Sequence, residues 1–205
     1  MLAIDFRGDV LIEGFDGNNT LSGGQGDDTI ISGHGNDHLS GGSGNDSITA
    51  SAGNDEISGD NGRDTIIGGH GHDVLRGGYG EDSIIAGQGN DLISGGHNND
   101  TIIGGPDRDI LNGWHGNDLI DAGSGADIID SGPGNDLALG GGGRDTIQAS
   151  EGDDTLHGGP GPDSFNDLLG DNQICRDASD TISDSRDGDT MMVDCDATLL
   201  LAAFE

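Results

Sequence analysis

A nine-residue motif repeats seventeen times without interruption between Gly14 and Asn166. It reads G-G-x-G-x-D-x-U-x, where U is a large apolar residue and x varies, and a clear copy spans Gly23 to Ile31. The sixth position is Asp in 16 copies, with Asn19 the exception, and the eighth is Leu, Ile or Phe in 16 copies, with Ala138 the exception. A fixed period of this kind indicates a repeat architecture, in which each copy adopts the same local structure.

Within each copy, the first six residues favour a turn and the last three favour a strand. Glycine at positions one, two and four permits backbone angles that are closed to other residues. Where position four is not glycine it is Asn98 or Asp107, and both residue types tolerate the left-handed region better than most. The last three residues, as in Thr65-Ile66-Ile67, form a short β-rich pattern with one inward side chain.

Two copies would then form one coil, and successive coils would stack at the strand spacing of a sheet, about 4.8 Å. The sequence therefore predicts an all-β fold, a parallel β-roll (β-solenoid) of about 17 nonapeptide repeats with two repeats per coil. In this arrangement Asp28, Asp46 and Asp64 stack in one row, and Asp37, Asp55 and Asp73 stack in the opposite row.

The composition of the chain indicates that this fold needs a bound cation. Only 30% of the residues are hydrophobic, 3% are aromatic, and the formal net charge is -32. Such values are typical of disordered chains, which bury too little apolar surface to offset the cost of ordering. Stacked carboxylates need a counter-charge, and a hard divalent cation between neighbouring turns could take two carboxylates plus backbone carbonyl oxygens. The sequence therefore predicts a chain that is disordered without such a cation and folded with it.

Over about three quarters of its length the chain resembles the RTX, or haemolysin-type calcium-binding, repeat family, whose nonapeptide is the motif above. The resemblance implies a parallel β-roll that binds calcium in its turns, with the position-six aspartates as ligands. These residues are Asp28, Asp37, Asp46, Asp55, Asp64, Asp73, Asp82, Asp91, Asp100, Asp109, Asp118, Asp127, Asp136, Asp145, Asp154 and Asp163. Seventeen turns in two rows leave spaces for up to about 15 calcium ions. The alternative is a metal-free solenoid in which the aspartates only cap turns.

The repeats, residues 14–166, are predicted to form the calcium-binding β-roll. Residues 1–13 contain one degenerate unit, with Gly8 and Ile12 at positions four and eight, and are interpreted as an N-terminal cap over the open core. Asp5, Arg7 and Asp9 interrupt any apolar run here, so no secretory signal is expected at this end. No segment has the length of a membrane span.

Residues 167–205 are predicted to form a C-terminal cap. The pattern continues faintly, slips by one residue, and reappears at Asp180 and Asp189. The apolar run 198–205 resembles a type I secretion signal loosely, and a hydrophobic cap on the last coil is the alternative. Cys175 and Cys195 are the only cysteines. They form a disulfide in an exported protein or remain free thiols, and their spacing does not support a zinc site.

We predict an extracellular, non-catalytic calcium-binding protein that passes a type I exporter unfolded and folds on calcium outside the cell. The chain has no H-E-x-x-H, no G-x-S-x-G and no P-loop, which argues against an enzyme. Its lack of lysine argues against an acylated pore-forming toxin. A surface or biofilm spacer, or the C-terminal part of a larger exported enzyme, is the alternative. Nucleic acid and anionic membranes should be repelled by so acidic a chain.

Two further features remain open at the outer rim of the turns. His34, His70, His97 and His115 share position three. His97 and His115 fall in adjacent coils, so they form either a weak transition-metal site or ordinary solvent-exposed rim residues. Trp114 replaces a glycine at position two, where an exposed ring either stacks on a sugar of a polysaccharide or cell-surface partner or is simply tolerated.

Overall fold

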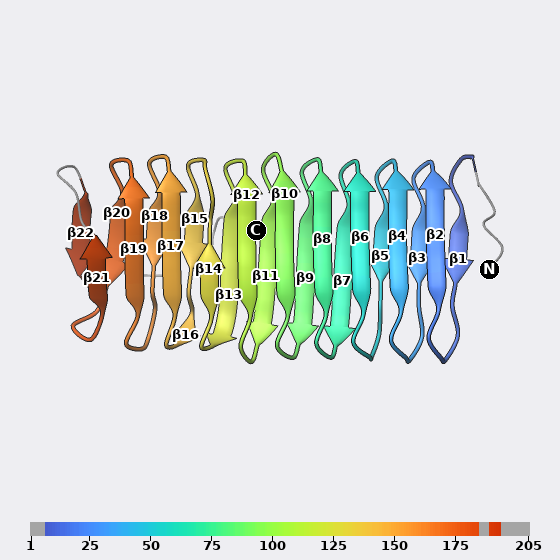
Figure 1. The fold of residues 1–205 in the computed structure, drawn as a ribbon, viewed down its shortest axis with the longest axis horizontal. Helices are drawn as coiled ribbons and strands as arrows, with labels where there is room; N and C mark the ends of the chain where they lie inside the picture. The colour runs from blue at the N-terminus through green and yellow to red at the C-terminus, as the bar shows by residue number, and fades with distance from the viewer. Residues whose placement is uncertain (1–6, 185–188, 194–205) are drawn as a thin grey trace.

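The chain winds into a parallel β-solenoid whose strands alternate between two sheets (Figure 1). The computed structural model describes residues 7–184 and 189–193, in which all regular structure is β. The larger sheet contains β1 (Leu11–Glu13), β3 (Thr29–Ile31), β5 (Ser47–Thr49), β7 (Thr65–His70), β9 (Ser83–Gln88), β11 (Thr101–Pro106), β13 (Leu119–Gly125), β15 (Leu137–Leu139), β16 (Gly142–Gly143), β18 (Thr155–His157), β20 (Gln173–Arg176) and β22 (Thr190–Val193). The smaller sheet contains β2 (Thr20–Gln25), β4 (His38–Ser43), β6 (Glu56–Asn61), β8 (Val74–Tyr79), β10 (Leu92–His97), β12 (Ile110–His115), β14 (Ile128–Asp130), β17 (Thr146–Glu151), β19 (Ser164–Leu169) and β21 (Thr181–Asp184).

Neighbouring strands of a sheet are one coil apart in sequence. Ile30 pairs with Ile48 in the larger sheet, and Ile93 pairs with Leu111 in the smaller one, a separation of eighteen residues in both cases. Eighteen residues are two nonapeptides, so each coil contains two repeats and each repeat contributes one strand. The predicted all-β parallel β-roll is confirmed.

The core is a thin layer between the two sheets. Position-eight side chains point inward from both sheets, and Ile30, Leu39 and Ile48 are at most 1% exposed. Side chains alternate along a strand, so position one, two residues further on, also points inward. That position is glycine or a small residue such as the buried Ala86, because it faces the carboxylate at position six and a carbonyl oxygen of the next coil. Ala138 keeps the inward position of the larger residues and is fully buried.

Strand pairing continues beyond the last complete repeat. β19 pairs with β21 through Ser164 and Thr181, seventeen residues apart, and the register shifts at Phe165 and Asn166. β20 pairs with β22 through Gln173 and Thr190, again seventeen residues apart. The phase slip in the sequence thus corresponds to coils that are one residue shorter.

The predictions for the cysteines, the C-terminal apolar run and a membrane span concern features other than the nonapeptide repeats. Of the two alternatives for the cysteines, the disulfide is the one found: Cys175, 4% exposed in β20, is disulfide-bonded. Cys195 and the apolar run 198–205 lie outside the described residues. Within the described residues there is no helix long and apolar enough to cross a membrane.

Candidate metal centre

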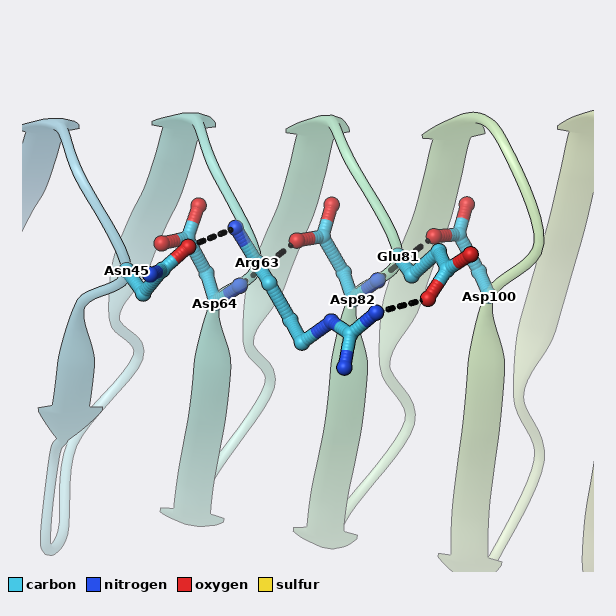
Figure 2. Close-up of polar contacts among 6 residues, drawn as sticks. All are labelled: Asn45, Arg63, Asp64, Glu81, Asp82 and Asp100. Carbon is cyan, nitrogen blue, oxygen red and sulfur yellow. Dashed lines mark hydrogen bonds and ion pairs between the residues drawn. The ribbon is translucent and has the colours of Figure 1, made fainter.

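The position-six aspartates form two rows, one along each edge of the roll. The Oδ1 of Asp82 accepts the backbone N–H of Asp64, and the Oδ1 of Asp100 accepts that of Asp82, both at 2.8 Å (Figure 2). The same contact joins every successive pair in both rows of the predicted ligands, from Asp28 to Asp154 and from Asp37 to Asp163. One carboxylate oxygen of each residue therefore holds the turn of the preceding coil in register.

The other carboxylate oxygen of these aspartates, Oδ2, does not take part in the hydrogen bonds between coils. Oδ2 is buried and accepts no hydrogen bond within the described residues in Asp28, Asp37, Asp46, Asp55, Asp64, Asp73, Asp82, Asp91, Asp100, Asp109, Asp118, Asp127, Asp136, Asp145 and Asp163. These residues are at most 3% exposed. A buried polar atom without a partner is costly, and a buried unpaired charge more so. The fold thus collects acidic oxygens that its own donors do not satisfy.

Burial also makes the ionised form of these groups unfavourable. Desolvation raises the pKa of Asp100 from 3.8 to about 8; the N–H of Asp82 opposes this shift, and the charges of Asp118 and Asp82 add to it. For the same leading reason the pKa values of Asp64 and Asp109 rise to about 7. A row of ionised carboxylates at neutral pH therefore requires a compensating positive charge.

Backbone carbonyl oxygens lie beside the unpartnered carboxylate oxygens. A Cβ placed on Gly68 would lie 2.6 Å from the carbonyl oxygen of Ala86 and 2.7 Å from the Oδ2 of Asp73. A Cβ on Gly104 would meet the carbonyl oxygen of Ala122 and the Oδ2 of Asp109 at the same two distances. The position where a Cβ of each of these glycines would lie is thus bordered by a carboxylate oxygen and by a carbonyl oxygen of the next coil.

These donors fit a hard cation. No group of three or more His, Cys, Asp or Glu side chains that could hold a metal occurs within residues 7–184 and 189–193. An ion between two turns would therefore take carboxylates from the two adjoining coils and complete its shell with carbonyl oxygens. Oxygen-only coordination of this kind suits calcium, whereas imidazole and thiolate ligands favour transition metals.

The repeats match a known family model. The model, described as the RTX calcium-binding nonapeptide repeat, matches residues 13–48, 40–75, 67–102, 76–111, 95–129 and 130–165, about three quarters of the chain in total. The chain belongs to the RTX calcium-binding repeat family. No curated protein matches it. The predicted recognition of RTX repeats is confirmed, and calcium binding is the function that these repeats indicate.

The RTX turns also contain a second ladder that the sequence analysis missed. At position five, the Oδ1 of Asn45 accepts the N–H of Arg63 at 2.8 Å (Figure 2), and the Oδ1 of Asn54 accepts the N–H of His72 at 2.9 Å. This ladder accepts from the following coil, whereas the aspartate ladder accepts from the preceding one. The available signal was asparagine at position five in 8 of 17 copies.

Because the RTX turns pack closely, one added methyl group at a turn glycine should lower the stability of the fold strongly. Gly44, at position four, has φ 131°, and a Cβ there would overlap the carbonyl oxygen of Gly26. We expect Gly44→Ala to lower the free energy of unfolding in calcium by about 1–3 kcal/mol or more, because strain and overlap add. Thermal unfolding followed by circular dichroism measures this change.

Gly142→Ala is the matched control, since a Cβ at Gly142 meets no atom within 4 Å. Its effect should stay within about 0.5 kcal/mol. Equal effects of the two substitutions would contradict the packing seen between turns.

Proposed function

We propose that this chain is a secreted, non-catalytic calcium-binding RTX β-roll that folds on calcium outside the cell. The observation that carries this proposal is the row of buried Oδ2 atoms without hydrogen-bond donors on each edge of the roll. The ligands would be the sixteen position-six aspartates from Asp28 to Asp163, with carbonyl oxygens of the neighbouring turns. The spaces between turns accommodate up to about 15 ions.

Calcium binding would be coupled to folding because each site needs two coils. The carboxylates of Asp82 and Asp100 adjoin only when residues eighteen apart are stacked, so an unfolded chain does not offer the site. Each site filled at 100 times its dissociation constant adds about 2.7 kcal/mol to the stability of the folded state. Because coils contact only their neighbours, successive sites would fill with a steep, cooperative transition.

This coupling suits an exported chain. Calcium is scarce in the cytosol, so the chain would remain unfolded there and could pass through a type I exporter. Outside the cell, where calcium is plentiful, calcium would bind and the chain would fold. The acidic surface of the roll would keep the protein in solution and would repel nucleic acid.

The test is a calcium titration of the chelated protein followed by far-UV circular dichroism, with magnesium as the control ion. We expect a steep transition from coil to β structure with calcium and none at equal magnesium, because magnesium dehydrates reluctantly and demands octahedral geometry. If the β signal is already complete in chelator at neutral pH, the proposal is wrong. The chain would then be a metal-free solenoid that acts as a structural spacer.

A further inference from the structure

Four exposed rings gather at one edge of the roll. Tyr79, His97 and His115 occupy position three in β8, β10 and β12, where they pair residue to residue. The rings of Tyr79 and His97 stack with centroids 4.5 Å apart and an interplanar angle of 10°, and those of His97 and His115 are 5.2 Å apart at 22°. Trp114 lies 6.3 Å from the ring of His115 at 65°. We call these four residues the aromatic edge.

Trp114 adopts a backbone conformation that its side chain disfavours. Its φ is 71°, in the left-handed region, and its paired residue in the preceding coil is Gly96. The Oδ1 of Asn112 accepts the N–H of Trp114 at 2.9 Å and so helps to hold this conformation. Trp114 remains 51% exposed, so the strain is not compensated by full burial. Strain that the surrounding structure maintains is a feature of ligand-binding sites.

Amide side chains lie along the same turns. Asn99, Asn117 and Asn135 occupy position five, and all three are exposed. The N–H of Asn117 donates to the Oδ1 of Asn99, and the N–H of Asn135 donates to the Oδ1 of Asn117, both at 2.8 Å. The amides are thus held in a row, one per coil, with their NH2 groups as further donors.

Three successive turns at this edge carry no exposed charged side chain. The turns 95–100, 113–118 and 131–136 contain no Glu, Lys or Arg, and their only Asp residues are the buried Asp100, Asp118 and Asp136. Glu81, which lies in the turn of Tyr79 and pairs with Arg63, and Glu151 lie in the neighbouring turns. In a chain with a net charge of -32, such a stretch favours an uncharged ligand.

We propose that the aromatic edge, together with Asn99, Asn117 and Asn135, binds a linear uncharged polysaccharide. Ring faces and edges pack against the C–H surfaces of sugars, and amides exchange hydrogen bonds with sugar hydroxyls. The rings follow three successive coils and the amides follow three, with two coils in common, and such a linear array suits a chain of repeating sugar units. A transition-metal site is not favoured here, because His97 and His115 are the only imidazoles in the stack.

Trp114 is the only tryptophan in the chain, so its fluorescence reports on this site directly. In calcium, the full chain is titrated with the neutral hexasaccharides cellohexaose, xylohexaose and laminarihexaose, and with an anionic oligogalacturonate. We expect a saturable change in Trp114 emission with at least one neutral hexasaccharide and none with the anionic one. The site requires only the folded roll, and circular dichroism of the same samples tests the fold separately from sugar binding.

Variants then locate the binding. His97→Ala should weaken binding of the neutral hexasaccharide that binds the parent about tenfold. Trp114→Ala should abolish this binding, which is measured by calorimetry because the variant has no tryptophan fluorescence. Leu92→Ala is the control, because Leu92 is 48% exposed on the same strand as His97 but lies outside the aromatic edge, and it should bind normally. The proposal is overturned if none of the three neutral sugars gives a saturable change, or if only oligogalacturonate binds. It is equally overturned if Trp114→Ala instead dissociates a dimer in sedimentation, since a second copy would then occupy the edge.

Discussion

Without metal, the chain should gain β structure as the pH falls from about 8 to about 5. The pKa values of the buried aspartates are raised in the folded state, to about 8 for Asp100 and about 7 for Asp64 and Asp109, from an ordinary value of 3.8. A raised pKa means that the folded state binds protons more tightly than the unfolded state. The stability so contributed is complete below pH 3.8 and is lost as the pH rises through about 6 to 8. Far-UV circular dichroism in chelator across this range measures the effect.

With saturating calcium, the dependence of stability on pH should reverse. Calcium binds the ionised carboxylates, so protons compete with it and acid should then destabilise the roll. Sedimentation at each pH serves as the control, because a chain with an isoelectric point near 4.1 loses charge repulsion as acid is added. A metal-free β signal that grows with rising pH would show that desolvation of the aspartates does not govern folding.

Asp100→Asn should change stability in opposite directions with and without calcium. Asparagine keeps an Oδ1 to accept the N–H of Asp82, but it removes the charge at Oδ2. In chelator at neutral pH the variant should be more stable than the parent, because the parent must take up a proton at Asp100 when it folds. In calcium it should be less stable by up to about 5 kcal/mol, since Asp100 adjoins two spaces between turns and each filled site is worth about 2.7 kcal/mol. Urea unfolding in both conditions measures the two differences.

Asp153→Asn is the matched control for this substitution. Asp153 also accepts a backbone N–H through Oδ1, from Asp171 at 3.1 Å, but it is exposed at position five. The variant loses the same charge without relieving burial, so its stability should change by less than about 0.5 kcal/mol in either condition. If Asp100→Asn lowers stability equally in chelator and in calcium, the role of Asp100 is structural and calcium is not its partner.

The period of the sequence was sufficient to predict the coil and the rows. A repeat of nine with one large apolar residue fixes which side chains point inward, and two repeats per coil place Asp64 above Asp46. The period does not determine hydrogen-bond geometry. It did not indicate that Oδ1 and Oδ2 have different surroundings, or that position five forms a ladder of its own.

Departures from the repeat were harder to predict. Asp180 and Asp189 continue the two rows at a separation of seventeen residues, because a coil can shorten in its turn while the carboxylate still reaches the N–H of the preceding coil. The positive φ of Trp114 runs against its residue type, so propensity alone would not place it there. The stacking of Tyr79 with the two histidines depends on side-chain orientation, which sequence spacing leaves undetermined.

The eighteen-residue register also has a kinetic consequence. Strands pair with partners one coil away in sequence, so the typical separation is eighteen residues in a chain of 205, a relative contact order of about 0.09. That value lies in the range of helical bundles, whereas β-sandwiches and barrels pair residues much farther apart. Each coil closes a loop of the same short length, and no step must wait for a distant part of the chain. Adding coils would lengthen the molecule without slowing the joining of any two neighbours.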